Sequence, residues 1–206
     1  MKLVVLTAPS GSGKTTIARR LMEEVPELKF STSATTRHPR SGEVDGEDYF
    51  FLSPEEFEGR IAEDAFIEWE EVYPGTFYGT LRGEIERIAN EGAALLDIDV
   101  KGALSVKRRY GAGALTLFIR PPSLATLAER LQRRKTETPA TLAQRIERAQ
   151  AELDYASEFD AIIVNADLET AVSETVATVR RFLDAGFRPP RPEVPSEDRS
   201  AEETSL

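Results

Sequence analysis

The chain has 206 residues, of which 40% are hydrophobic, enough to fill a buried core in one or two domains. Its 26 basic and 36 acidic residues give a net charge of −10, which argues against broad binding to nucleic acids or anionic membranes. Because the chain has no cysteine and only one histidine, we predict no disulfides and no histidine metal site. Because it has neither a signal peptide nor an 18-residue apolar run, we predict a cytoplasmic location.

Compact apolar runs, typical of buried strands, alternate along the chain with segments whose apolar residues recur at helical spacing. In chain order we predict a strand at 3–6, helices at 15–25 and 82–90, a strand at 93–98, a helix at 102–110, a strand at 114–119, helices at 123–134 and 140–156, and a strand at 161–164. Strands that alternate with helices indicate an α/β fold with a parallel sheet covered on both faces.

Three stretches depart from this rhythm. Residues 31–80 are rich in Thr, Gly, Pro and aromatics and contain DYFFLSPEEF, a short strand followed by a helix with Ser53 as its N-cap and Glu56 three residues later. We expect an insert with its own small fold there. Residues 126–154 carry two helices joined by a polar turn, which we interpret as a mobile flap. Residues 189–206 are dense in Pro and charge, so a disordered tail is predicted.

The stretch LTAPSGSGKTT, residues 6–16, joins the first strand to the first helix, which is the context of a phosphate-binding loop. Gly11 and Gly13 let successive backbone N–H groups turn toward an anion at the positive end of the helix. Lys14 adds a full charge, and Thr15 offers a hydroxyl to Mg²⁺. Alanine at the first glycine position costs little wherever φ is negative. The predicted nucleoside triphosphate site comprises Ala8, Pro9, Ser10, Gly11, Ser12, Gly13, Lys14, Thr15 and Thr16; a glycine-rich turn with a chance lysine is the alternative.

A second anion site is predicted in the insert. The run STSATTRHPRSG, residues 31–42, is free of acidic residues and places Arg37 and Arg40 three residues apart. Two guanidinium groups beside several hydroxyls suit a phosphate monoester, because guanidinium forms paired hydrogen bonds with phosphate oxygens. The acceptor of a phosphoryl group is therefore expected to bind here.

Several separated motifs then occur in an order that resembles the guanylate kinase family over roughly residues 3–185: SATTRHPRSGEVDGEDYFF, FIEW, YGT, LLDID and TET…RI…AQAEL. The resemblance implies transfer of the γ-phosphoryl group of ATP to GMP, with Mg²⁺ as cofactor and dGMP as a further acceptor. It also implies a P-loop NTPase core at 1–32, 81–125 and 157–188, a small α+β GMP-binding insert at 33–80 and a helical lid at 126–156.

Carried over by position, the resemblance assigns nine residues to GMP: Ser33, Arg37, Arg40, Tyr49, Glu68, Tyr78, Gly79, Thr80 and Asp99. Guanine offers adjacent N1–H and N2–H donors that one carboxylate can accept together, which supports Glu68 on chemical grounds. The alternative for Glu68 is a solvated carboxylate at a strand edge. For Asp99 and the unplaced Asp97, the alternative is to cap the next helix.

In the lid, Arg134 and Arg145 match arginines that the family folds over the transferring phosphate, so they are predicted to be catalytic together with Lys14. Asn165 matches a position beside the adenosine of ATP. Arg148 is interpreted as part of a solvated helix face or a local ion pair.

The sequence departs from the family pattern at the positions of Lys101, Lys135 and Ala166, and Pro74 is an extra residue before Tyr78. These departures bear on the lid hinge and the adenine site, but they remove no assigned phosphate or guanine contact.

Two alternative functions stay open. A guanylate-kinase-like peptide-binding module would keep the fold without turnover, although such modules typically have degraded phosphate loops and this loop is intact. A kinase of a phosphorylated sugar would keep the loop but would not need Glu68 and Thr80, which face guanine in the resemblance.

Overall fold

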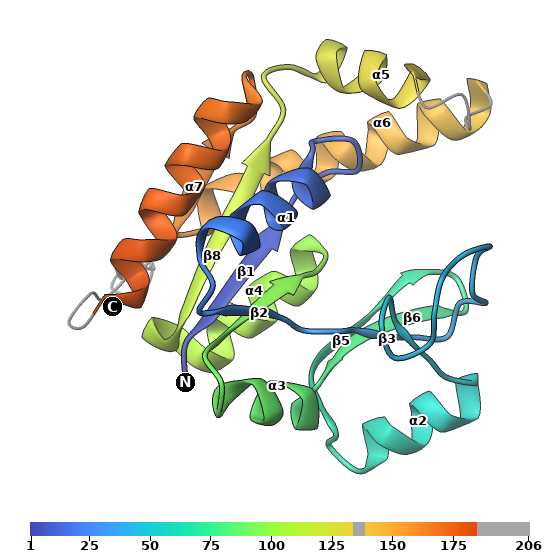
Figure 1. Ribbon diagram of the computed structural model, residues 1–206. Helices are drawn as coiled ribbons and strands as arrows, with labels where there is room; N and C mark the ends of the chain where they lie inside the picture. The colour runs from blue at the N-terminus through green and yellow to red at the C-terminus, as the bar shows by residue number, and fades with distance from the viewer. Residues whose placement is uncertain (134–138, 185–206) are drawn as a thin grey trace, which may run out of the picture.

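The computed structural model describes residues 1–133 and 139–184, and it contains two sheets (Figure 1). The larger sheet has five parallel strands in the order β2-β7-β1-β8-β9. Its strands are β1 (Leu3–Thr7), β2 (Leu28–Phe30), β7 (Ala93–Asp97), β8 (Ala114–Arg120) and β9 (Ala161–Val164). The predicted parallel α/β core is confirmed, and the four predicted strands agree with the structure to within two residues. The short β2 was not predicted.

Helices cover both faces of this sheet. In β1, Val4 and Leu6 pack toward one apolar cluster, while Leu3 and Val5 pack toward the other. All four are fully buried, which explains why β1 reads as a continuous apolar run rather than an alternating one. The first cluster includes side chains of α1 (Lys14–Glu24) and α7 (Leu168–Leu183), and the second includes those of α3 (Arg82–Ala89) and α4 (Val100–Tyr110).

A buried ionic network ties α4 to the edge of the core sheet. Asp160 accepts from the backbone N–H and the hydroxyl of Thr116 at 2.8 and 2.7 Å, and it pairs with Lys107 at 3.1 Å. The Asp160 side chain is only 4% exposed. Removal of one partner from such a pair leaves the other charge buried and uncompensated.

Asp160→Ala should therefore lower the free energy of unfolding by about 3–5 kcal/mol, because Lys107 and the Thr116 N–H both lose their partner. Urea unfolding measures this effect. Glu158→Ala is the control, since Glu158 is exposed and Lys107 contacts only its backbone oxygen. If the two variants lose equal free energy of unfolding, the Asp160 network contributes no more to stability than an exposed surface side chain does.

The second sheet has four strands in the order β4-β3-β6-β5 and lies to one side of the core with α2 packed on it (Figure 1). Its elements are β3 (Ala34–Thr35), β4 (Phe50–Phe51), α2 (Pro54–Ala62), β5 (Phe66–Tyr73) and β6 (Thr76–Leu81). The rings of Phe57 and Phe66 stack at 4.4 Å in its small core. The predicted cap is confirmed, since Glu56 N–H donates to Ser53 Oγ at 3.1 Å and Ser53 N–H to Glu56 Oε2 at 2.7 Å.

Two further helices, α5 (Leu124–Arg133) and α6 (Pro139–Asp154), lie together above the sheet (Figure 1). Leu127 and Leu131 of α5 pack against Ala149 of α6. Short 3-10 helices occupy Gly111–Gly113 and Ala156–Glu158. Arg134, Lys135 and the predicted tail at 189–206 lie outside the described residues. No helix in the part of the chain that the structure describes is long and apolar enough to cross a bilayer.

Candidate functional site

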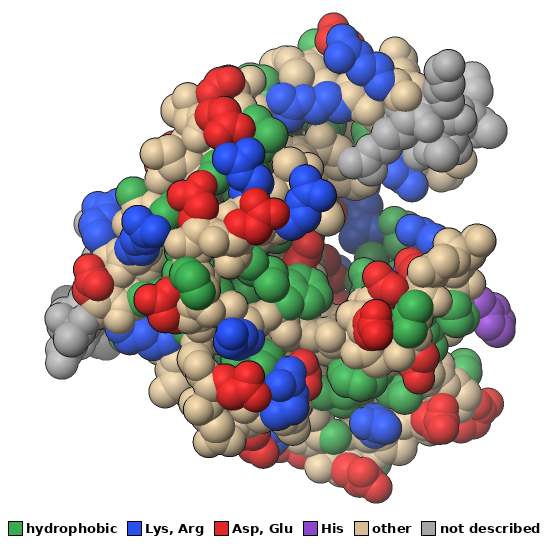
Figure 2. Space-filling view, viewed as in Figure 1, with side chains coloured by type: hydrophobic (Ala, Val, Ile, Leu, Met, Phe, Trp, Pro, Cys, Tyr) green, Lys and Arg blue, Asp and Glu red, His purple; other side chains and the backbone are tan. Residues whose placement is uncertain are grey.

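A cavity of about 460 Å³ lies between the loop before α1, the carboxyl end of the core sheet, the second sheet and α6. Figure 2 shows it as a hollow between the upper helices and the smaller sheet, with basic side chains around it. It brings together most of the predicted site residues: Ala8, Pro9, Ser10, Gly11, Gly13, Lys14, Thr15, Thr16, Ser33, Arg40, Tyr49, Glu68, Tyr78, Gly79, Asp99 and Arg145. Of the predicted residues that the structure describes, those that do not line it are Ser12, Arg37, Thr80 and Asn165.

The loop between β1 and α1 has the backbone shape that binds an anion. Gly11 and Gly13 have φ of 96° and 92°, a region that side chains disfavour. Ala8 does not have positive φ, so alanine fits there without strain. The Ser12 hydroxyl is buried and has no hydrogen-bond partner in the described ranges. The Ser12 backbone N–H donates to the Pro9 carbonyl at 3.1 Å, which closes the turn of the loop.

Lys14, the first residue of α1, reaches across to the end of β7. Its ammonium group pairs with the Asp97 carboxylate and donates to the Ile98 carbonyl at 3.2 Å. Asp97 could not be placed from the sequence, and the structure gives it this ion pair. The lysine charge is thus held at the carboxyl edge of the parallel sheet, where ligands of open α/β sheets bind.

Glu68 presents a buried carboxylate from β5 to the same cavity. It is 8% exposed and accepts from the Thr80 hydroxyl at 2.5 Å. Burial raises the pKa of Glu68 to about 7, the Thr80 hydrogen bond opposes this shift, and the nearby Asp99 carboxylate adds to it. The side chain is therefore not the solvated strand-edge glutamate that the sequence left as an alternative.

Asp99 combines a structural role with a place in the cavity. Its carboxylate accepts from the Gly102 N–H at 2.8 Å and caps α4, as one of the two predicted roles requires. Asp99 also lines the cavity.

Arg37 stands behind the cavity wall, while Arg40 lines it. The Arg37 guanidinium donates to both Glu43 oxygens at 2.7 and 2.9 Å and to the Tyr78 hydroxyl at 3.2 Å, and it lies over the Tyr49 ring. Hydrogen bonds from Arg37 and from the Arg40 N–H lower the pKa of Glu43 to about 2. Arg37 therefore contacts both Tyr49 and Tyr78 and fixes their positions in the cavity wall.

Comparison with known proteins fits this arrangement. The guanylate kinase profile matches residues 1–184. Guanylate kinases from Salinibacter ruber and Chlorobaculum tepidum are 56% and 50% identical, over 89% and 88% of this chain and 97% and 93% of their own lengths. The crystal structure of a guanylate kinase from Anaplasma phagocytophilum has a TM-score of 0.72 and 31% identity, covering 88% of this chain and 86% of that one. The chain belongs to the guanylate kinase family.

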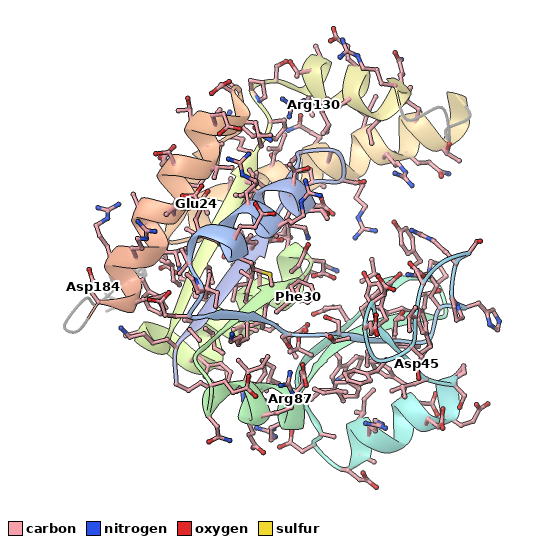
Figure 3. All side chains as sticks on the ribbon, viewed as in Figure 1. Glu24, Phe30, Asp45, Arg87, Arg130 and Asp184 are labelled. Atoms are coloured by element: carbon pink, nitrogen blue, oxygen red, sulfur yellow. The ribbon has the colours of Figure 1, made fainter. Side chains whose placement is uncertain are left out.

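In this member of the guanylate kinase family, Asn165 stands behind the loop. Its side-chain amide donates to the Ser12 carbonyl at 2.7 Å, and its backbone carbonyl accepts from the Arg130 guanidinium at 3.0 Å. Arg130 belongs to α5 (Figure 3). Asn165 is 4% exposed. A Cβ at Gly13 would collide with its amide nitrogen. The structure thus gives Asn165 a contact with the loop backbone that the resemblance did not suggest.

Two arginines of α6 reach the cavity of this guanylate kinase family member. Arg145 approaches the Ser10 hydroxyl at 3.4 Å. Arg148 forms the predicted kind of local ion pair, with Glu152 at 2.8 Å, and in addition donates to the Val72 carbonyl of β5 at 3.1 Å. It also lies over the Tyr73 ring at 5.1 Å. Arg148 therefore links α6 to the second sheet.

Sequence reasoning did not assign to the site several residues that line the cavity. Phe30 ends β2 where the chain leaves the core sheet (Figure 3). Asp97, in the run LLDID, was visible in the sequence as a candidate site residue. The other unassigned residues belong to elements that meet only in the folded chain. The unassigned lining residues are Phe30, Asp48, Val72, Tyr73, Asp97, Ile98, Arg148, Ala149 and Glu152.

Proposed function

We propose that this chain transfers the γ-phosphoryl group of ATP to GMP and releases ADP and GDP. Membership of the guanylate kinase family supports the reaction. The observation that carries the assignment to this cavity is that a phosphate loop with Lys14 and a buried carboxylate, Glu68, line the same cavity. Donor and acceptor phosphates would then meet between them.

The loop suits the phosphates of ATP. Its glycines have the positive φ that such a loop needs, and α1 begins at Lys14, which lines the cavity, so the positive end of the helix would face the phosphates. Lys14 would place its charge on the outer phosphates, and Ser10 and Thr16 line the approach. Asn165 would act on ATP through the loop backbone, and a direct contact with adenosine stays a prediction.

The hydroxyl of Thr15, a residue that lines the cavity, would hold Mg²⁺. Magnesium sites in such enzymes use one or two protein oxygens, with the rest of the coordination supplied by phosphates and water, so one hydroxyl fits this role. The ion, when bound, neutralises charge on the transferring phosphoryl group.

GMP would lie with its phosphate toward Arg40, Tyr49 and Tyr78 and its base toward Glu68. Arg37 would contribute through its hold on the tyrosines and its positive charge. Ser33, Gly79, Thr80 and Asp99 complete the proposed guanine end. None of these residues is assigned to the ribose 2′-hydroxyl, so we include dGMP among the acceptors.

The transfer itself needs no general base, because the attacking oxygen of GMP is already anionic. Positioning and charge stabilisation can therefore supply the catalysis. Lys14 and Arg145 would stabilise the charge that develops on the phosphoryl group, and Arg134 would join them from outside the described residues. The proposed parts are the core (1–32, 81–125, 157–188), the GMP-binding insert (33–80) and the lid (126–156). A cytoplasmic location stays a prediction.

The two alternatives have less support. The intact loop argues against a peptide-binding module without turnover. The buried Glu68–Thr80 pair argues against a phosphorylated sugar as acceptor, because a sugar phosphate lacks the two adjacent N–H donors that this carboxylate could accept.

ADP release with Mg-ATP, measured with and without GMP, tests the proposed reaction. We expect rapid release only when GMP is present, because closure of the site around both substrates excludes water. Equal rates with and without GMP would contradict the proposed transfer and indicate an ATPase.

The affinity for GMP should depend on pH through Glu68. Its pKa is raised to about 7, and the ionised form accepts the guanine donors, so binding below that pH releases a proton. From about pH 8 to about pH 6, the Kd for GMP should rise roughly tenfold through this group, measured by calorimetry.

Two variants separate this effect from titration of the GMP phosphate, which occurs equally in all proteins. Glu68→Gln should lose the contribution, whereas Glu70→Gln, altered two positions along β5, should keep it. A pH profile of Glu68→Gln identical to the wild-type profile would contradict the assignment of Glu68.

A further inference from the structure

The carboxylate of Glu68 rests on α4 at a position that has no side chain. Gly102 lies in the first turn of α4 and is buried. A Cβ built on it would collide with Glu68 Oε2 and would lie 3.2 Å from Glu68 Cδ and 3.5 Å from Asp99 Oδ1. The carboxylate thus occupies the space that any other residue at this position would fill.

The contacts around Glu68 determine which atoms a side chain at position 102 would displace. The Thr80 hydroxyl holds Glu68 Oε1 at 2.5 Å on the side of β6. Arg109 of α4 donates to the Ile67 carbonyl at 3.3 Å, which ties the helix to β5. An added methyl group would therefore meet the end of a flexible side chain while the strand and helix stay together. The carboxylate would move, and the fold would remain.

We propose that Gly102 is a specificity-determining position for the nucleobase, because its missing side chain fixes where the Glu68 carboxylate stands. Guanine N1–H and the 2-amino group can reach both carboxylate oxygens only while Oε2 keeps its place against α4. This inference rests on the proposed function, in which Glu68 receives those two donors. Gly102 touches no substrate and acts as a positioning residue.

Gly102→Ala tests the proposal. We expect kcat/KM for GMP to fall roughly 30-fold, chiefly through a higher KM, because a displaced carboxylate loses charge-assisted hydrogen bonds to the base. The preference for GMP over IMP, which lacks the 2-amino group, should shrink, and the KM for ATP should stay unchanged. A variant with wild-type KM and wild-type GMP-to-IMP preference would overturn the proposal.

Gly83→Ala is the matched control. Gly83 lies within α3, and a Cβ there would meet nothing within 4 Å. Both substitutions replace a helical glycine with a residue of better helix propensity, so propensity alone would not lower the stability of either. Gly83→Ala should keep the wild-type KM for GMP. An equal rise in KM for the two variants would overturn the proposal, since the effect would then come from glycine replacement in general.

A double-mutant cycle with Glu68→Asp separates positioning from a general packing defect. Aspartate is shorter by one methylene, so its carboxylate withdraws from α4. Adding Gly102→Ala to Glu68→Asp should change kcat/KM for GMP by less than about threefold, far less than it changes the wild type. Equal effects in both backgrounds would overturn the proposal. If Gly102→Ala alone does not fold, the Glu68→Asp background is used by itself: Glu68→Asp with Gly102→Ala should fold, and a fall in kcat/KM for GMP well beyond threefold relative to Glu68→Asp would overturn the proposal.

The failure of this inference differs from the failure of the proposed function. If Glu68→Ala keeps the guanine preference, the role of Glu68 itself is wrong. If Glu68→Ala loses that preference while Gly102→Ala keeps it, only the inference about Gly102 is wrong.

Discussion

Lys14→Ala should lower kcat for phosphoryl transfer from ATP to GMP by about a thousandfold, because the charge that faces the transferring phosphate is removed. Stopped assays of GDP formation at saturating ATP and GMP measure this loss. The structure holds the Lys14 ammonium group at the end of β7, against the Asp97 carboxylate and the Ile98 carbonyl. From there it faces the cavity at the site proposed for the donor phosphates.

Ala8→Gly is the matched control in the same loop. Ala8 does not adopt positive φ, so glycine offers no conformational gain there, and kcat should stay within about twofold of the wild type. Thermal unfolding of both variants shows whether the fold survives the loss of the Lys14–Asp97 pair. A folded Lys14→Ala protein with wild-type kcat would contradict the proposed role of the loop.

Glu68→Ala should lower kcat/KM for GMP by roughly 10- to 1,000-fold, as hydrogen bonds between a charged group and the base are lost. The preference for GMP over AMP should shrink with it, because a buried carboxylate discriminates strongly against a base that cannot satisfy it. Arg40 and the cavity tyrosines remain, so weak binding of nucleoside monophosphates should survive. Initial rates over a range of each monophosphate measure both effects.

Glu70→Ala is the control for this substitution. Glu70 lies on the same strand and is more exposed than Glu68, so it should keep the guanine preference. If Glu68→Ala retains wild-type kcat/KM and selectivity, base selection must lie with Ser33, Thr80 or Asp99.

The core could be predicted because its signals are local. Continuous apolar runs mark strands that are covered on both faces, and the Ser53–Glu56 cap needs only four consecutive residues. The two aromatic residues of β4 were predicted as a short strand before the capped helix. The strands β2 and β3 have at most three residues each, which is too few for a periodicity to register. Their place in the fold depends on their partners in the two sheets.

The phosphate-binding loop and the order of motifs predicted which residues form the site. The hydrogen-bond and ion-pair partners of several of these residues became known only from the folded structure. Arg37 and Glu43 are six residues apart, and nothing in the sequence indicates that they pair rather than both facing a ligand. Asn165 meets the carbonyl of Ser12 across 153 positions of sequence. Contacts over such separations follow from strand order, which a single sequence does not reveal.

The structure shows where Pro74 lies, which the sequence alone did not explain. Pro74 and Gly75 form the two-residue turn between β5 and β6, and Gly75 has φ of 73°. Proline followed by glycine suits a turn that needs positive φ at its second central position. Pro74 thus lies at the tip of the hairpin, and Tyr78 and Gly79 of β6 line the cavity.

The most direct test of the account is the initial rate of Mg-ATP-dependent phosphorylation of a panel of acceptors: GMP, dGMP, AMP, UMP, CMP and a ribose bisphosphate. With the diphosphate product of each reaction resolved by chromatography, we predict rapid formation of GDP and dGDP. AMP should react at least about a hundredfold more slowly in kcat/KM, because it cannot satisfy Glu68. Turnover of the sugar phosphate in preference to GMP, or tight peptide binding without any turnover, would contradict the account.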